Sequence, residues 1–390
     1  MCRGRPALQW PGESSALWDV CLIPRHTRPV LVWEHSDVKL RQEILARVNR
    51  IVIKLGTGLL TDAQNHLALG QIEVLIAQVA ALHEQKKQII IVSSGAIGAG
   101  MAELGLKQRP RRLDELQAAA AIGQSKLMAV YDELFGKFGI TVAQVLLTHD
   151  DLKDRTRHLN AHSTLTTLLA RGIVPIINEN DTVAVEEIKF GDNDRLGALA
   201  ATLVDADLLI VLSHVEGLLD RDGRVVSVVA EITSEIGLLA GGTDRATSVG
   251  GMKSKIEAGK IVTRVGIPLV IACGERANVL ADILAAKDVG TIFLPHPDKL
   301  ASRKRWIAFF QRPAGALTVD DGAKQALCAN GKSLLAKGIV AADGDFERGD
   351  VVSIRDKNQI EFARGLTRVG GIQIKSVTGV VIHRDDMVIL

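Results

Sequence analysis

Between residues 50 and 294 the chain alternates short aliphatic runs with longer amphipathic stretches. The aliphatic runs are continuous in hydrophobicity, which is typical of strands buried on both faces of a sheet. They occupy residues 51–56, 88–95, 139–147, 173–178, 208–213 and 267–274. The stretches between them, such as residues 67–87, have helical spacing. Strand and helix in repetition predict an α/β fold, a three-layer sandwich whose helices cover both faces of a mostly parallel central sheet.

This alternation of aliphatic runs and amphipathic stretches ends near Leu294. Residues 295–315 form a basic connector that contains prolines, and we interpret its "RKRW" motif, residues 303–306, as part of a solvated linker. Short strand-like pieces separated by Gly and Asp turns follow it. They predict a small, mostly β second domain at residues 313–390, after a first domain at residues 46–304.

The first 45 residues lack a sustained helical or strand period, although they hold three of the four tryptophans. No uninterrupted apolar run precedes Glu13 and Asp19, so a signal peptide is not predicted. We predict that residues 1–45 are a disordered extension or an artefact of the assigned start. No methionine lies between Met1 and Met101, so an internal start would need another codon, with Val38 as a candidate.

The amino-acid composition argues against several classes of protein. The hydrophobic fraction of 47% and the charged fraction of 24% are ordinary for a soluble globular protein, and the net charge of +2 gives no broad basic footprint for nucleic acid. The four cysteines form no C-x-x-C pair, which argues against zinc and disulfides and fits a reducing cytosol. No apolar run approaches the ~20 residues that span a bilayer. The sequence therefore predicts a cytoplasmic protein without a membrane segment.

Ligands bind parallel sheets at the carboxyl ends of the strands, and two unusual segments follow such ends directly. Lys54 closes the first aliphatic run, where a buried charge calls for an anion; a lysine that reaches solvent at the sheet rim is the alternative. The segment "VSSGAIGAG", residues 92–100, lacks the dinucleotide and P-loop glycine spacings. It still permits an anion to approach a helix start, and glycines that serve helix packing are the alternative.

A second glycine-rich segment, residues 248–260, places Gly250 and Gly251 before a helix that begins with Lys253 and Lys255. Residues two apart on a helix point to nearly opposite sides, so at most one of these lysines serves a given site. A phosphate-binding loop and a solvated helix start are both compatible with this pattern.

Residues 174–201 concentrate acids and amides between two apolar runs. Asp181 follows a predicted strand, and Asp192, Asn193 and Asp194 precede an apolar helix. The regular ligand spacing of an EF-hand is absent, and a helix cap explains one of these acids but not the set. Lysines that neutralise phosphate, near acids and amides that hold an ammonium group, suggest phosphoryl transfer to an amino acid.

Four segments together resemble the glutamate 5-kinases of the amino acid kinase superfamily. They are "IVIKLGTGLLT" (51–61), "IVSSGAIGAG" (91–100), "VPIINENDTVAVEEIKFGDNDRLGALAA" (174–201) and "GGMKSKIEA" (250–258). The resemblance runs from about Val48 to the C-terminus, where residues 313–390 are similar to a shortened PUA domain. It implies transfer of a phosphoryl group from ATP to the γ-carboxylate of L-glutamate, the first step of proline biosynthesis. Mg²⁺ is then carried by ATP, and no protein metal site is predicted.

The resemblance also assigns roles to individual residues. The catalytic residues are Lys54, Lys255, Asp192 and Asp194, with Asp192 orienting the two lysines. Glutamate is bound by Ser94, Asn178, Asp181 and Asn193. ATP is bound by Lys54, Ser213, His214, Val249, Gly250, Gly251, Met252, Lys253, Ser254 and Lys255. His214 stands where the family usually has Asp, and Ser248 and Val249 replace Gly and Thr, so the chain departs from the pattern at its nucleotide contacts.

A dimer or tetramer, feedback inhibition by proline and glutamyl phosphate reductase as a downstream partner are further implications. Another amino acid kinase, such as an acetylglutamate or uridylate kinase, is the nearest alternative. A protein that binds or modifies RNA through its PUA-like domain is an alternative of a different class. Formation of ADP from Mg-ATP and glutamate without RNA discriminates between these functions.

Overall fold

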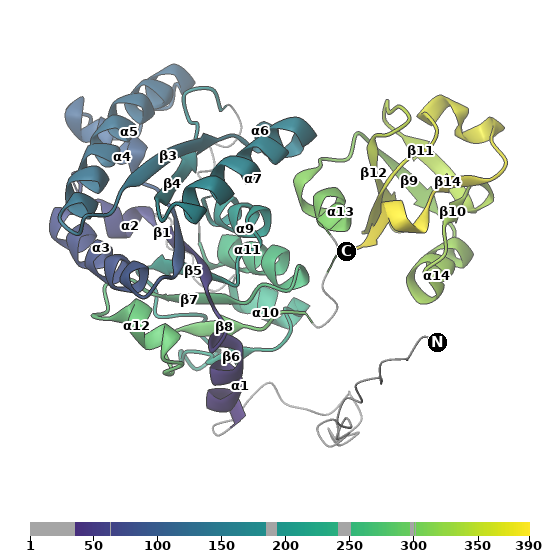
Figure 1. Ribbon diagram of the computed structural model, residues 1–390. Helices are drawn as coiled ribbons and strands as arrows, with labels where there is room; N and C mark the ends of the chain where they lie inside the picture. The colour runs from purple at the N-terminus through teal and green to yellow at the C-terminus, as the bar shows by residue number, and fades with distance from the viewer. Residues whose placement is uncertain (1–35, 63, 185–192, 241–250, 297–299, 301) are drawn as a thin grey trace, which may run out of the picture.

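The computed structural model describes residues 36–62, 64–184, 193–240, 251–296, 300 and 302–390 (Figure 1). A large sheet flanked by helices is formed by the chain up to residue 293, and smaller sheets are formed by the rest. The two parts lie beside each other, joined by a short helical connector.

The large sheet contains the six predicted strands in the order β3-β4-β2-β1-β5-β7, extended by β8 and β6. The bounds are β1 Arg50–Leu55, β2 Gln88–Val92, β3 Val142–Leu147, β4 Val174–Glu179, β5 Leu208–Ser213, β6 Val228–Val229, β7 Leu269–Cys273 and β8 Thr291–Phe293. Neighbouring strands are parallel except β7 and β8, which pair antiparallel. The predicted α/β class and mostly parallel sheet are confirmed. Strands β6 and β8 escaped prediction because they span two and three residues.

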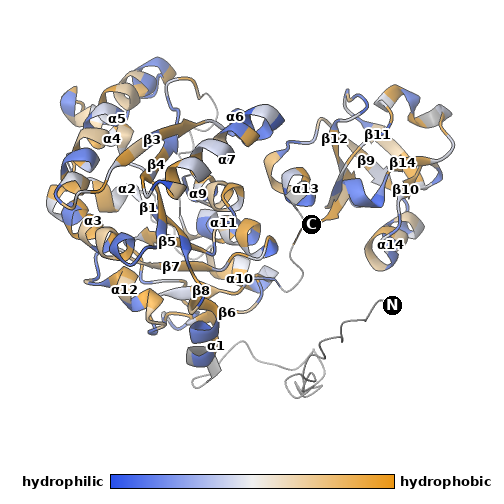
Figure 2. Cartoon of the chain, viewed as in Figure 1, coloured by the Kyte–Doolittle hydropathy of each residue, from blue (hydrophilic) through white to orange (hydrophobic). Residues whose placement is uncertain are grey.

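Alternate residues of a strand point to opposite faces, so the sheet supports two apolar cores. Ile51 and Ile53 pack on one face with α3 (Leu69–Glu84), α5 (Leu113–Gly136) and α12 (Val279–Leu284). On the other face Val52 packs with α7 (Arg155–Ala170), α9 (Asn193–Leu203) and α11 (Met252–Arg264). Figure 2 shows hydrophobic colour along β7 and β8, between helices that carry hydrophilic residues on their outer sides. These are the three predicted layers.

Shorter helices complete this part of the chain. They are α1 (Ser36–Leu45), α2 (Thr57–Leu60), α4 (Ala96–Glu103), α6 (His149–Lys153) and α10 (Ser234–Leu239). In the part of the chain that the structure describes, no helix is long and apolar enough to cross a membrane.

The C-terminal part is mostly β, as predicted. Five strands pair in the order β11-β9-β12-β13-β15, and β10 pairs with β14. The bounds are β9 Gly315–Val319, β10 Leu334–Leu335, β11 Ile339–Asp343, β12 Val351–Arg355, β13 Glu361–Leu366, β14 Val380–Ile382 and β15 Met387–Ile389, with helix α14 at Asp321–Asn330 and 3-10 helices at Ala336–Gly338, Gly371–Ser376 and Arg384–Asp386. A separate apolar core, which includes Leu317, Val352 and Ile382, holds these elements together.

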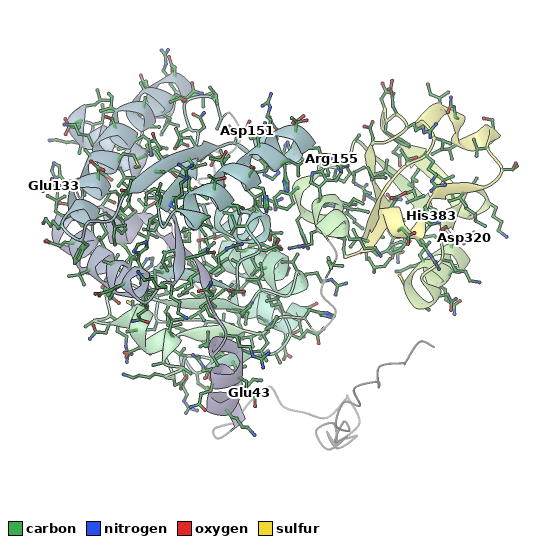
Figure 3. The ribbon with its side chains drawn as sticks, in the orientation of Figure 1. Glu43, Glu133, Asp151, Arg155, Asp320 and His383 are labelled. Carbon is green, nitrogen blue, oxygen red and sulfur yellow. The ribbon has the colours of Figure 1, made fainter. Side chains whose placement is uncertain are left out.

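The connector is packed against both parts, so our interpretation of residues 303–306 as a solvated linker is wrong. It consists of α13 (Ser302–Arg305) and a π-helix, η2 (Trp306–Phe310). Ile307 is buried against Val388 of the C-terminal part, while Phe310 belongs to the core on the α7 side of the large sheet. The apolar residues that directly follow the basic run explain this burial. Asp151 and Arg155, labelled in Figure 3, lie where α6 and α7 face the connector.

The N-terminal helix α1 also differs from prediction, because it belongs to the fold although it lies inside the predicted extension 1–45. Arg41 is fully buried and donates hydrogen bonds to four backbone carbonyls: Ser227 at 2.6 Å, Gly290 at 2.8 Å, Val289 at 3.2 Å and Lys287 at 3.3 Å. A buried arginine leaves little apolar periodicity to detect, which explains why the pattern missed this helix. Residues 1–35 lie outside the described residues.

Arg41→Ala should lower the free energy of unfolding by about 2–4 kcal/mol, because it leaves several buried carbonyl groups without their donor. The matched control is Arg47→Ala, at an exposed position just beyond α1, which should change stability by less than about 0.5 kcal/mol. Urea unfolding of both variants measures the difference. Equal midpoints would show that the docking of α1 does not stabilise the fold.

Candidate active site

The carboxyl ends of four neighbouring parallel strands, β4, β2, β1 and β5, meet at one edge of the large sheet. The register places Lys54 of β1 between Val92 of β2 and Val211 of β5. Helices α9 and α11 begin at the same edge, since residues of their first turns contact each other and Lys54. The polar residues that follow these strands are therefore brought together, as the strand order predicts.

Asp194, in the first turn of α9, joins two lysines from different elements. Its Oδ1 lies 2.6 Å from Nζ of Lys54, and its Oδ2 lies 3.2 Å from Nζ of Lys255. Ser254 Oγ donates a hydrogen bond of 2.6 Å to the same Oδ2. Lys54, Lys255 and Asp194 are 7%, 4% and 1% exposed. Two buried ammonium groups are thus held close together, where an anionic ligand would be attracted to both of them.

Asp194 is a fixed negative charge. Burial acts to raise its pKa, but the charges of Lys54 and Lys255 outweigh that effect and lower the pKa to about 2. The carboxylate therefore stays ionised near neutral pH, where it neither donates nor accepts a proton. Its role in the site is to hold the two ammonium groups in place.

The first residue of α9, Asn193, connects this centre to β2 and β4. Its Nδ2 donates hydrogen bonds of 2.8 Å to the Ser93 carbonyl and to the Ser94 hydroxyl, and lies 3.3 Å from Oδ1 of Asn178. Asn178 in turn donates to Oε1 of Gln124 at 2.7 Å. The amide network fixes the side chains at the ends of both strands relative to α9.

A pocket opens beside this network. The polar side chains that line it are Thr57, Ser94, Arg109, Asn178, Glu179, Asp181 and Asn193. The first turn of α4 also lines it, and Gly95 before that helix adopts a left-handed conformation with φ of 90°. No side chain caps the start of α4 among the described residues, so its backbone N–H groups are available to an anion.

Asp181 is an acid of this pocket whose pKa is shifted by its surroundings. Burial raises the pKa of Asp181 to about 6, against the opposing effect of the Arg109 charge. A bound ammonium group would favour the ionised carboxylate and lower this pKa. The pocket can therefore couple binding of a cationic group to the loss of a proton from Asp181.

The glycines of residues 92–100 serve packing as well as access. A Cβ at Gly100 would lie 1.7 Å from the carbonyl oxygen of Ala119, and one at Gly123 would lie 1.7 Å from that of Ala96. Helices α4 and α5 therefore pack backbone to backbone. The packing interpretation of the segment is confirmed, and this packing positions the helix start that lines the pocket. Approach of an anion to that helix start stays a prediction.

The residues predicted to bind the nucleotide lie next to the lysine centre where the structure describes them. Ser213 ends β5 in a buried position, and His214 follows it in an exposed one. Gly251 is the N-cap of α11 and Met252 its first residue. The start of α11 and the end of β5 therefore lie next to the two lysines, on the side opposite the hydrogen-bonded amides of Asn193 and Asn178.

The two lysines of α11 occupy opposite sides of the helix, as their spacing predicts: Lys253 is exposed and Lys255 is buried against Asp194. Asp192, Val249 and Gly250 lie outside the described residues. The family resemblance assigns the orientation of the two lysines to Asp192, and the described residue that contacts both of them is Asp194. Ser254, predicted to bind the nucleotide, also helps to hold Asp194.

Arg109 was missed by sequence reasoning. It lies in the loop between α4 and α5, away from any strand end, and the same loop carries the basic residues Lys107, Arg111 and Arg112. No local signal separates it from a solvated arginine, and only the folded chain brings it to the wall of the pocket.

The described residues offer no group of three or more His, Cys, Asp or Glu side chains suited to hold a metal ion. Asp194 is a poor cation ligand because both of its oxygens face ammonium groups. The arrangement fits an anionic phosphate more closely than a metal held by the protein.

Two known families match this chain in consecutive regions. Residues 49–273 match the amino acid kinase family, and residues 315–384 match the PUA domain. A protein of Moorella thermoacetica named glutamate 5-kinase is 45% identical over 368 residues, which cover 89% of this chain and 97% of the relative. A protein of Geobacter sulfurreducens with the same name is 45% identical over 373 residues, covering 90% of this chain and 100% of the relative. Both relatives thus align over the large sheet and the C-terminal part together.

Asp194→Asn should lower the free energy of unfolding by about 3 kcal/mol near pH 7, because two buried lysines lose their counter-charge. The folded pKa of Asp194 lies below its unfolded value, so this contribution is present above about pH 4 and is lost as pH falls toward about 2. Urea unfolding at several pH values should show the gap between variant and wild type close in acid. Asp222→Asn, at an exposed position, is the control; a gap that persists in acid would contradict the assignment.

Proposed function

Because this chain belongs to the glutamate 5-kinases of the amino acid kinase family, we propose that the pocket beside Asn193 holds L-glutamate and that Lys54 and Lys255 bind the phosphoryl group it receives from ATP. The observation that supports this most directly is the shared Asp194 carboxylate. It holds two ammonium groups at the same sheet edge as a pocket lined by acids and amides.

In this reaction a γ-carboxylate oxygen of glutamate forms a bond to the γ-phosphorus of ATP. The bond from that phosphorus to the β-phosphate oxygen breaks, ADP leaves, and the product is L-glutamyl 5-phosphate. A side-chain carboxyl group with a pKa of about 4.3 is already ionised near neutral pH, so no general base is required. Catalysis then depends on alignment and on neutralisation of negative charge.

Lys54 and Lys255 supply that neutralisation. Their Nζ atoms are held by different oxygens of Asp194, which keeps two positive charges close together without solvent reorganisation. The two positive charges compensate negative charge on the transferring phosphoryl group and on the leaving phosphate. Mg²⁺ would arrive bound to the ATP phosphates, where it adds charge neutralisation. The nucleotide would lie along the end of β5 and the start of α11, near Ser213, His214 and Ser254.

The glutamate side of the site follows from the charges of the substrate. Ser94, Asn193 and the open start of α4 offer donors to the γ-carboxylate. Asp181 offers a carboxylate to the α-ammonium group. Asn178 holds Asn193 and thereby positions the acceptor relative to the lysines.

The charges of the pocket also distinguish glutamate from the alternative substrates, acetylglutamate and uridylate. An acetylglutamate kinase binds an amino acid whose nitrogen carries no charge, so a buried Asp181 would face an uncharged amide there. Uridylate would bring a phosphate to the two acids of the pocket. The curated relatives favour glutamate over both.

Roles for the remaining parts of the chain are proposals of the same kind. We assign the kinase to residues 46–304, amended at its start to include α1, and a PUA-like unit to residues 313–390. Proline as a feedback inhibitor, a homodimer or homotetramer, glutamyl phosphate reductase as a partner and a cytoplasmic location are expectations from the family. RNA binding by the PUA-like unit is a second candidate function, supported by the family match at residues 315–384.

A coupled assay of ADP release tests the proposal with three acceptors: L-glutamate, N-acetyl-L-glutamate and UMP. Turnover should occur with L-glutamate and Mg-ATP in the absence of RNA. Lys54→Ala and Lys255→Ala should each lower kcat by about 10²–10³-fold with a smaller effect on the KM for glutamate, because each removes a charge that acts in the transition state. Lys253→Ala is the matched control from the exposed side of α11 and should be nearly neutral. Loss of activity in the control alone would overturn this placement.

The pKa of Asp181 predicts a pH dependence. With an ionised Asp181 as the partner of the α-ammonium group, the KM for glutamate should be flat above about pH 7 and rise as pH falls below about 6, approaching tenfold per pH unit. Asp181→Asn should raise this KM at every pH and abolish its rise between about pH 6 and 5. Steady-state kinetics across this range, with Asp222→Asn as the control, provide the measurement. A variant that retains the acid-side rise would show that another group titrates.

A further inference from the structure

An α-amino acid carries an α-ammonium group and an α-carboxylate on the same carbon. The proposed function gives the ammonium group a partner but gives none to the α-carboxylate. The γ-carboxylate meets the lysine side of the site, and the α-ammonium group meets Asp181. The α-carboxylate is adjacent to that ammonium group, so it lies within a few ångströms of wherever Asp181 binds. Placing this carboxylate among Glu179 and Asp181 would be unfavourable unless a cation is present.

Arg109 provides such a cation. It lines the same pocket as Asp181 and Asn193, although more than 70 residues separate it from both in the sequence. It lies close enough to Asp181 for its charge to lower the pKa of that acid. Arg109 is exposed, so an incoming ligand can reach its guanidinium group.

We propose that Arg109 binds the α-carboxylate of glutamate and so selects for an intact α-amino acid. This inference rests on the proposed function, because it names the specificity residue of the same site. A guanidinium presents paired N–H donors whose planar geometry matches a carboxylate, which an ammonium group does not. Binding exchanges the attraction between Arg109 and Asp181 for two contacts with the substrate, one to each of its α-substituents.

The neighbouring arginines show that Arg109 is distinguished by its position in the pocket wall and not by the basic character of its loop. Arg112 pairs with Asp114, with Nη2 and Oδ2 2.5 Å apart, at an exposed position at the start of α5. Arg111 is also exposed and is not part of the pocket wall. Arg111→Ala therefore removes the same charge from the same loop without altering the pocket.

Arg109→Ala should raise the KM for glutamate by about 10–100-fold, while kcat stays within about threefold and the KM for ATP is unchanged. Arg109→Lys should restore only part of the loss, because a lysine keeps the charge but not the paired donors. Arg111→Ala should behave as wild type. Unchanged glutamate kinetics in Arg109→Ala would overturn the proposal.

A second substrate makes the test specific for the α-carboxylate. The α-amide of L-glutamate keeps the ammonium group and the reacting γ-carboxylate but lacks the α charge. Wild type should prefer glutamate over this amide by about tenfold or more in kcat/KM, and Arg109→Ala should lose most of that preference. An undiminished preference in Arg109→Ala would show that another group reads the α-carboxylate.

The outcomes distinguish a failure of the proposed function from a failure of the role of Arg109. Absence of glutamate-dependent ADP release from wild type contradicts the proposed function itself, whereas active wild type with an unaffected Arg109→Ala contradicts only the role of Arg109. Thermal melts accompany the kinetics. If Arg109→Ala does not fold, Arg109→Gln, which keeps most of the side-chain volume, undergoes the same two measurements with the same criteria.

Discussion

The site depends on one carboxylate that holds two lysines at the edge of a buried sheet. A lysine at the end of a core strand is costly to bury, and two of them within reach of each other repel. Asp194 offsets both costs because each of its oxygens faces a different ammonium group. Two positive charges held close together at this sheet edge attract an anion. Burial of all three groups keeps that attraction strong by limiting screening from water and salt.

Adjacent residues at the start of α9 serve the two halves of the site. Asp194 turns toward the lysines, while Asn193 turns toward Ser94 and Asn178. Successive side chains on a helix diverge by about 100°, so one helix start can address two neighbouring subsites at once. In the proposed reaction, packing of α9 on the sheet therefore fixes the distance between the phosphoryl donor and its acceptor. A displacement of α9 would misalign both halves together.

Much of this arrangement was predictable because it follows from strand order. Continuous aliphatic runs identified six strands, and Lys54, Ser94, Asn178 and Asp181 lie at or just beyond the carboxyl ends of three of them. What escaped prediction depends on tertiary contacts that leave no local pattern. Arg41 is buried through hydrogen bonds to carbonyls from distant loops, the apolar half of the connector is covered by both parts of the chain, and Arg109 reaches the pocket from an ordinary basic loop. The contact between Asp194 and both lysines is likewise a product of helix packing.

The distribution of charge in the site favours one orientation of the bound substrate. On the proposed nucleotide side, Lys54 and Lys255 flank the Asp194 carboxylate, and on the proposed amino acid side, the described lining of the pocket includes Glu179, Asp181 and Arg109. A molecule with a carboxylate at one end and an ammonium group at the other is favoured in a single orientation, with its carboxylate toward the lysines. Reversal would bring the ammonium group toward two like charges and the carboxylate toward two acids. Although burial raises the pKa of Asp181 to about 6, most of this carboxylate is ionised near neutral pH and attracts the ammonium group.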